Sequence, residues 1–244
     1  MKALYRILAA TAMLLVLATA LRFTPGPSAA TTGQISGTIK LDGPAPHSRP
    51  IDMSKDPGCA QMRGGAEATA ESVVVGANGG LANVVVYISQ GLTGNEAASS
   101  QPVTLSQKGC QYVPHVVAVN VGQHLMLVNE DKTLHNIHPE PARPGNNQWN
   151  KAQMMGSPPI DVTWASEEVA IPVKCNIHPW MRGFIAVVKG PVAVSNDSGA
   201  FELDNVAPGT YTLTAWQETY GTQTQKVTVA AGKPAAADFV FKAK

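Results

Sequence analysis

The chain has 244 residues, of which 44% are hydrophobic and 14% are charged, so it can bury a real core in one or two domains. Residues 1–30 carry three basic and no acidic residues, which leaves the rest with 15 Lys and Arg against 17 Asp and Glu residues. Because no Arg-rich run or basic patch appears, we expect no nucleic-acid partner.

The N-terminal segment has the pattern of an export signal. Lys2 and Arg6 precede an apolar run of about 15 residues, which suits a signal peptide and is short for a membrane span. Small residues at Ser28 and Ala30 predict cleavage after Ala30, and an earlier cut after Ala20 also fits. We expect a periplasmic or secreted protein, with membrane attachment only if the signal stays uncleaved.

Short segments rich in Val, Ile and Thr follow this signal, separated by Gly, Pro, Asn and Asp. They are typical of strands, and helical periodicity is weak. The predicted strands are 33–41, 71–76, 81–89, 102–107, 115–121, 124–130, 167–175, 184–190, 199–206, 209–218 and 224–232. This spacing favours an all-β protein made of sandwiches or barrels. Residues 91–101 and 140–163 lack the pattern, and we expect a linker and a long surface loop there.

The three cysteines have different surroundings. Cys59 and Cys110 lie in turn-like contexts, and an oxidising compartment favours the pairing of two cysteines. A disulfide between them is the economical interpretation, although spacing alone does not fix connectivity. Cys175 lies among metal-ligand residues and is the candidate for a metal thiolate.

The segment VKCNIHPWM places three possible metal ligands, Cys175, His178 and Met181, within seven positions. A thiolate, an imidazole and a thioether together favour copper, and blue-copper sites combine two His and one Cys with a weak axial Met. The second imidazole has to come from elsewhere. The segment NEDKTLHNIHPE offers His135 and His138.

Residues 101–190 resemble a cupredoxin, a small blue copper protein of the plastocyanin and amicyanin kind. PVTLSQKGCQYVPHVVAVNVGQHLMLVNEDKTLHNIH is similar to the opening strands of that family, and VAIPVKCNIHPWM is similar to its closing ligand loop. The resemblance implies a Greek-key β-sandwich in which Asn136 ties the two ligand loops together. The copper ligands that it implies are His135, Cys175, His178 and Met181.

Two of these assignments have alternatives. Met181 could be an ordinary core methionine, and His138 could replace His135 as the first imidazole. The family places its first ligand directly before the residue that corresponds to Asn136, which favours His135.

The resemblance also predicts where electrons leave the site. It implies that the imidazole edge of His178 is the ligand atom nearest to solvent, beside Pro179 and Trp180, and that His135 is more buried. Exposed apolar groups beside a site often mark partner contacts. A redox partner protein is therefore expected to dock near His178 and Trp180.

Residues 194–229 resemble the carboxypeptidase regulatory-like β-sandwich, which is related in shape to transthyretin. Its pattern G-x-F-x-L-x-x-x-x-P-G-x-Y-x-L is met by GAFELDNVAPGTYTL, where alternating strands flank a Pro-Gly turn and their apolar side chains can share a buried face. Earlier strands of that domain resemble 35–46 and 81–88. The expected domains are a signal peptide (1–30), a discontinuous regulatory-like sandwich (33–98 and 191–244) and an inserted cupredoxin domain (101–190).

Residues 47–80 exceed the usual connection in such a sandwich and weaken this division. Three domains in a row are the alternative.

The leading functional hypothesis is a one-electron carrier with a type 1 copper site, in which a rigid sandwich holds ligands suited to both Cu(I) and Cu(II). The alternatives are a periplasmic Cu(I) carrier or storage protein and a structural adhesion module whose copper site is vestigial. An enzyme is not expected, because the sequence lacks a Ser/His/Asp set, an HExxH motif, a phosphate loop and a CxxCH haem motif. No small-molecule substrate is evident.

Overall fold

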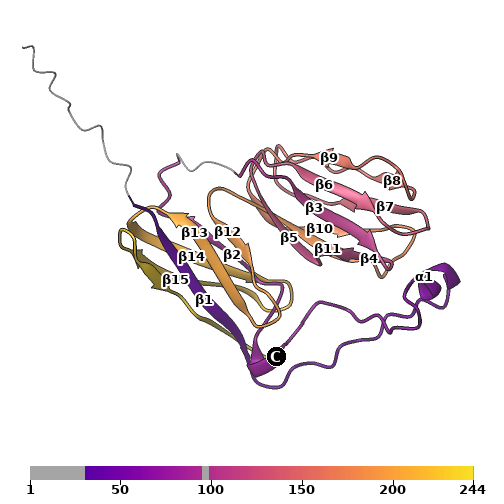
Figure 1. Cartoon of the computed structure of the whole chain (residues 1–244), viewed down its shortest axis with the longest axis horizontal. Coiled ribbons are helices and arrows are strands. Elements are labelled where there is room, and N and C mark those ends of the chain that lie inside the picture. The colour runs from indigo at the N-terminus through magenta and orange to yellow at the C-terminus, as the bar shows by residue number, and fades with distance from the viewer. Residues whose placement is uncertain (1–30, 95–98, 244) are drawn as a thin grey trace, which may run out of the picture.

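The computed structural model describes residues 31–94 and 99–243, which form two β-sandwiches side by side (Figure 1). The predicted signal peptide lies outside the described residues. The all-β fold class is confirmed, since the described helical structure amounts to α1 (Pro57–Met62) and the short 3₁₀ turn η1 (Ala77–Gly79). Neither element is long and apolar enough to cross a membrane.

The first sandwich takes strands from both ends of the chain. These are β1 (Gly33–Asp42), β2 (Val85–Gln90), β12 (Val192–Val194), β13 (Ala200–Val206), β14 (Gly209–Gln217), β15 (Gly221–Val229), β16 (Pro234–Ala236) and β17 (Phe239–Lys242). One sheet has the order β13–β1–β16, with β17 also paired to β1, and the other has the order β12–β2–β14–β15. The sandwich is therefore discontinuous in sequence, with the whole middle segment of the chain between β2 and β12.

The strands around the Pro-Gly turn bury the apolar side chains that alternation predicts. Phe201 and Leu203 on β13 and Tyr211 and Leu213 on β14 belong to one core cluster. However, β13 and β14 lie in opposite sheets. The turn carries the chain across the sandwich, so these side chains meet through the core and do not share one sheet face.

The second sandwich is formed by the middle of the chain. Its strands are β3 (Val103–Lys108), β4 (Gln111–Val113), β5 (Val116–Asn120), β6 (Leu125–Asn129), β7 (His135–Pro139), β8 (Lys151–Gln153), β9 (Ile160–Val162), β10 (Glu168–Lys174) and β11 (Arg182–Val188). The sheets have the orders β5–β11–β10–β7–β8 and β4–β3–β6–β9. They enclose a second apolar core, which includes Leu125, Leu127, Ile137 and Ile185.

Two segments differ from the prediction. Residues 140–163 are not one loop, because β8 and β9 lie within them and pair with β7 and β6. Three-residue strands are too short to show alternation. Residues 71–76 form no strand: Val75 makes a single bridge to Leu81, while Val73 is buried in the first sandwich's core. Their apolar character reflects side-chain packing and not a ladder of backbone pairs.

Residues 50–69, which we name the cap, leave the first sandwich and cover one end of the second. Pairing of Pro50 with Thr69 closes the base of the cap, and α1 lies beyond the end of the second sandwich (Figure 1). Met53 and Cys59 are buried in the second sandwich's core cluster, and Cys59 forms a disulfide with Cys110. The excess length of residues 47–80 thus lets the chain reach the other sandwich. The expected range 33–98 therefore does not pack as one unit, because Met53 and Cys59 of the cap belong to the core of the second sandwich.

Candidate metal centre

The sequence-predicted ligands meet at the end of the second sandwich that the cap covers. His135 begins β7, Cys175 follows the last residue of β10, and His178 and Met181 lie in the loop to β11. Because β7 and β10 are antiparallel neighbours, the start of one lies beside the end of the other. This pairing brings the first imidazole to the closing ligand loop.

Two imidazoles and one thiol converge at this end. The Nδ1 atoms of His135 and His178 are 2.9 Å apart, and Cys175 Sγ is 3.8 Å from Nδ1 of His178. One donor atom from each of the three residues lies within 4.8 Å of the other two. All three side chains are at most 2% exposed, so bulk water has little access to the donor atoms.

Backbone hydrogen bonds close the ligand loop. The N–H of Cys175 donates to the carbonyl of Met181 at 3.2 Å, and the N–H of Met181 donates to the carbonyl of His178 at 2.9 Å. The N–H of His178 also donates to Cys175 Sγ at 3.4 Å. Met181 is fully buried in the same core cluster as Cys175, so all four predicted ligand residues lie at one end of one core.

Asn136 joins the two ligand loops, as the resemblance implies. Its Oδ1 accepts hydrogen bonds from the backbone N–H of Asn176 at 2.8 Å and from Cys175 Sγ at 3.4 Å. His138, the alternative first imidazole, lies on the other face of β7 by strand alternation. Its two ring nitrogens contact Asn176 and Gln148, so its imidazole is engaged outside the donor set.

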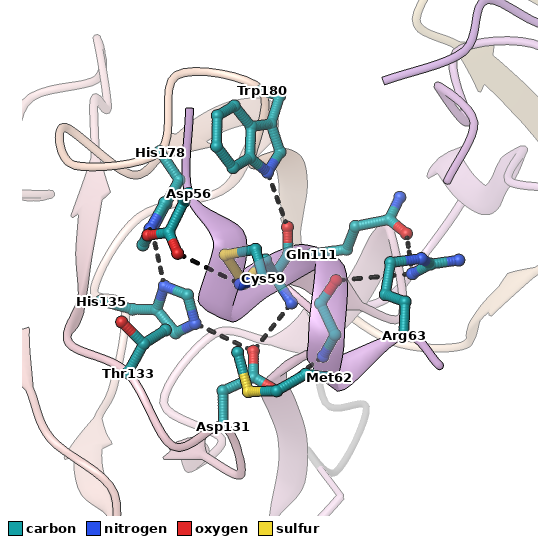
Figure 2. Close-up of a disulfide and its surroundings, with 12 residues drawn as sticks. Asp56, Cys59, Met62, Arg63, Gln111, Asp131, Thr133, His135, His178 and Trp180 are labelled. Carbon is teal, nitrogen blue, oxygen red and sulfur yellow. Dashed lines mark hydrogen bonds and ion pairs between the residues drawn. A yellow bond between two sulfur atoms is a disulfide. The ribbon is translucent and has the colours of Figure 1, made fainter. Parts of the chain in front are cut away.

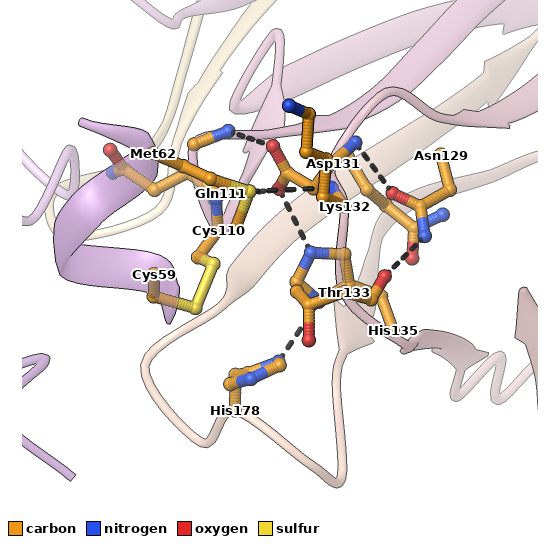
Figure 3. Close-up of polar contacts among 12 residues, drawn as sticks. Cys59, Met62, Cys110, Gln111, Asn129, Asp131, Lys132, Thr133, His135 and His178 are labelled. Atoms are coloured by element: carbon orange, nitrogen blue, oxygen red, sulfur yellow. Dashed lines mark hydrogen bonds and ion pairs between the residues drawn. A yellow bond between two sulfur atoms is a disulfide. The ribbon is translucent and has the colours of Figure 1, made fainter. Parts of the chain in front are cut away.

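A carboxylate holds the outer nitrogen of each imidazole, and Asp131 does so for His135. Its Oδ2 lies 2.9 Å from His135 Nε2 and accepts the N–H of Cys110 at 2.8 Å, while its Oδ1 accepts the N–H of Gly109 at 2.7 Å. Burial alone would raise the pKa of Asp131, but these hydrogen bonds outweigh it and hold the pKa below its ordinary value. Figure 3 shows this arrangement.

Asp56 plays the same part for His178, and it comes from the cap. One oxygen, Oδ2, lies 2.8 Å from His178 Nε2. The other, Oδ1, accepts the N–H of Cys59 at 3.1 Å and so caps the start of α1. The hydrogen bond to His178 is the largest influence that holds the pKa of Asp56 below its ordinary value. Figure 2 shows Asp56 between the imidazole and the helix.

Sequence reasoning missed both carboxylates. Asp56 precedes a proline in SKDPGC, which is a readable helix-start signal, but nothing local indicates that its second oxygen reaches a metal site. Asp131 lies four residues before His135, and the cue is equally weak because Asp131 lies in a loop and His135 begins a strand, so the spacing is not that of neighbours on a helix.

The prediction that His178 faces solvent is wrong, although His135, at 0%, is the more buried of the two imidazoles as expected. The side chain of His178 is 2% exposed, because the cap covers the edge that was expected to face solvent. Trp180 is half-buried, its ring lies 5.2 Å from that of His178, and its Nε1 donates to the carbonyl of Cys110 at 3.1 Å. Trp180 therefore packs against His178 of its own loop and links that loop to the disulfide residue Cys110.

The donor set fits a soft metal cation. A carboxylate accepts a hydrogen bond, so Asp131 and Asp56 assign the proton of each imidazole to Nε2 and leave both Nδ1 atoms as acceptors. Two acceptors 2.9 Å apart repel unless a cation, either a proton or a metal ion, lies with them. Burial disfavours ionisation of Cys175. When a proton is the cation shared at this pair, His135 can donate to the sulfur, and this hydrogen bond together with those from the backbone lowers the pKa of Cys175 to about 6, so a thiolate forms readily. Two imidazoles, a thiolate and an adjacent methionine are the blue-copper donor set.

Comparisons with known proteins gave one family-model match and partial likenesses to solved structures. The family model of the carboxypeptidase regulatory-like domain matches residues 186–242. Among solved structures, a copper-containing nitrite reductase (NirK) from Thermus scotoductus SA-01 is 24% identical, with a TM-score of 0.34, covering 41% of this chain and 25% of its own. The chain thus spans only a quarter of that protein's length.

Two further solved structures are cupredoxins. A Cu(I) amicyanin variant is 18% identical with a TM-score of 0.32, and the match covers 42% of this chain and 97% of the amicyanin. A purple cupredoxin from Nitrosopumilus maritimus is 20% identical with a TM-score of 0.29, covering 35% of this chain and 98% of that chain. No curated protein matches the chain.

Proposed function

We propose that this chain is an exported copper protein with a type 1 site, and that it carries one electron at a time. The observation that carries the proposal is the convergence of His135, Cys175 and His178 in one buried cluster. Copper bound there would supply a one-electron couple. Met181 is the candidate axial ligand, because the short backbone-closed loop holds it next to the other residues.

The residues around the site limit rearrangement of the ligands. Asp131 and Asp56 fix the two imidazoles. The backbone N–H of His178 donates to the sulfur, and Asn136 Oδ1 accepts the backbone N–H of Asn176 in the ligand loop. Such outer hydrogen bonds orient ligands and tune a metal's potential. A ligand set that is held in place before the electron arrives has little to reorganise.

A closed metal site is better suited to a protein that carries electrons than to a protein that delivers copper ions. An incoming ligand has to reach the metal to remove it, and the three donor side chains are at most 2% exposed. An electron needs no such contact. The same burial leaves no route for a substrate to the metal, so we propose a carrier and not an enzyme.

Export is part of the proposal. The N-terminal segment has the features of a signal peptide, and the Cys59–Cys110 disulfide is typical of a protein that works in an oxidising compartment. We therefore propose a periplasmic or secreted location.

Absorption spectroscopy of the copper-loaded, oxidised chain tests the type 1 site. The wild type is expected to show strong visible absorption from sulfur-to-copper charge transfer. Cys175→Ser should lose this band and keep the far-ultraviolet circular dichroism of the β fold. Stoichiometric Cu(II) without visible colour would overturn the type 1 assignment, and rapid loss of colourless Cu(I) to a chelator would favour the carrier or storage alternative.

We also propose that the redox partner docks beside the ligand loop, close to His178 and Trp180. Burial of His178 moves the candidate contact to its exposed neighbour Ile177, which is 46% exposed. Ile177→Glu should slow electron self-exchange and exchange with a partner at unchanged absorption. Val240→Glu, at a 52% exposed position on β17 of the other sandwich, is the matched control. Equal rates in the two variants would exclude this surface.

A further inference from the structure

A closed chain of contacts links the outer nitrogens of the two imidazoles. From His178, the contacts run to Asp56 and then to the N–H of Cys59. The disulfide crosses to Cys110. From there, the backbone N–H of Cys110 reaches Asp131, whose Oδ2 also contacts His135. Both carboxylates are thus positioned by the two halves of one disulfide (Figures 2 and 3).

The cap is fixed by more than the disulfide. Arg63 donates to Gln111 Oε1 at 2.8 Å and to the carbonyl of Gly109 at 3.4 Å. The backbone N–H of Lys132 approaches Met62 Sδ at 3.3 Å. These contacts attach the cap to the turn between β3 and β4 and to the loop that carries Asp131, so its position relative to the metal centre is set on several sides.

We propose that the cap completes the metal centre from outside the second sandwich, with Asp56 as a positioning residue for His178 and the Cys59–Cys110 disulfide as the link that fixes it. The inference deepens the proposed function and rests on it for its copper readout. It explains why the connection between β1 and β2 is long. Residues 50–69 supply His178 with the carboxylate of Asp56, which lies outside the inserted segment. They also close the site to solvent.

Removal of Asp56 is expected to act on His178 and on the start of α1, which its Oδ1 caps. Without its carboxylate partner the imidazole loses the contact that keeps the proton on Nε2 and turns Nδ1 toward His135. Loss of such an outer partner typically weakens metal binding about 10–100-fold.

The experiment uses the full-length mature chain, with and without copper. In the metal-free protein, Cys175 is the free cysteine of the described residues, so its rate of reaction with a bulky maleimide reports on closure of the site. Nitrogen-15 chemical shifts of His178 report its tautomer. Asp56→Ala is compared with Asp52→Ala, which removes another aspartate of the cap, whose carboxylate accepts the N–H of the nearby Ser54. Copper affinity is measured by chelator competition.

The expected result separates the two aspartates. Asp56→Ala should mix the His178 tautomers, speed labelling of Cys175 at least tenfold and weaken copper binding about 10–100-fold, and Asp52→Ala should match the wild type. The double variant Cys59→Ser/Cys110→Ser should label faster still. If Asp56→Ala folds poorly, the isosteric Asp56→Asn takes its place with the same readouts.

Identical tautomers and labelling rates in Asp56→Ala and Asp52→Ala would overturn the inference. The labelling rate of Cys175 and the tautomer of His178 are both measured on the metal-free protein, so these two results do not depend on copper binding. If both behave as expected while the copper-loaded wild type lacks type 1 absorption, the cap stands as inferred and the proposed function fails.

Discussion

Asp56 and His178 are 122 residues apart in the sequence, and their Oδ2 and Nε2 atoms are 2.8 Å apart. Asp56 belongs to the segment between β1 and β2 of the first sandwich, and His178 belongs to the ligand loop of the second. A metal site built at the end of one sandwich therefore depends on a loop from the other. In a chain cut down to residues 101–190, His178 would lose its carboxylate partner and Cys110 would lose its disulfide.

Thiol chemistry distinguishes the three cysteines. The unfolded, metal-free mature chain, kept under non-reducing conditions, should react with one equivalent of a thiol reagent, at Cys175, because Cys59 and Cys110 are bridged. Peptide mapping of the labelled protein checks the position. Three labelled thiols would rule out the bridge, and prior reduction provides the control in which all three react.

The disulfide should also contribute strongly to stability. The bridged residues are 51 positions apart, and closing a loop of that size lowers the entropy of the unfolded chain by the equivalent of about 4 kcal/mol at 25 °C in the chain-entropy estimate. Cys59→Ala/Cys110→Ala should lower the free energy of unfolding by up to that amount in urea titrations. Cys175→Ala, which breaks no bridge, is the comparison, and a smaller loss in the double variant than in this control would contradict the estimate.

Asp131→Asn tests the carboxylate behind His135. An amide cannot keep all three contacts that Asp131 makes, with His135 and with the N–H groups of Cys110 and Gly109. Copper affinity, measured by chelator competition, should fall about 10–100-fold. Asp161→Asn changes an exposed aspartate that pairs with His124 and should have no such effect. Equal affinities in the two variants would show that Asp131 does not support the ligand.

Glu71 should make the protein less stable as the pH rises. Burial raises the pKa of its carboxyl, against the opposing attraction of His115 and Arg63. As the pH passes the ordinary glutamate value of about 4.3, the unfolded chain loses this proton before the folded one does, so the unfolded state gains relative stability. The loss ends once the pH exceeds the raised folded pKa.

Glu71→Gln should remove that dependence. Relative to wild type, the variant should become progressively more stable across the same pH window, and the gain should then stay constant. Urea unfolding at a series of pH values measures the difference. A difference that does not change with pH would show that Glu71 ionises alike in the folded and unfolded states.

The core of the first sandwich should be energetically separable from the metal centre. Leu213 is fully buried in the first core cluster, and none of the candidate ligands belongs to that cluster. Leu213→Ala should cost about 2–5 kcal/mol of unfolding free energy and leave the copper absorption unchanged. Calorimetry and absorption on the same samples check both parts, and a shifted absorption band would show that the two sandwiches are coupled.

The sequence by itself predicted what depends on local pattern. Short runs rich in Val, Ile and Thr between turn residues indicated most of the longer strands of both sandwiches, since such side chains suit a pleated, partly buried strand. The spacing of Cys175, His178 and Met181 indicated a ligand loop, because one short turn can place all of them around one point. The choice of His135 came from a resemblance, and antiparallel pairing of β7 and β10 brings it to that loop.

Only the tertiary structure decided how the site is enclosed. The strands on either side of the Pro-Gly turn were readable, but their division between opposite sheets was not, since alternation is the same in either arrangement. Nor could pattern reveal that residues 50–69 cover His178. Asp56 looks like an ordinary helix cap in sequence, and its second oxygen acquires a partner only because the disulfide to Cys110 brings α1 to the ligand loop. Contacts between residues that are far apart in the chain leave no periodic trace in it, so the exposure of a ligand follows from packing and not from its neighbours in the sequence.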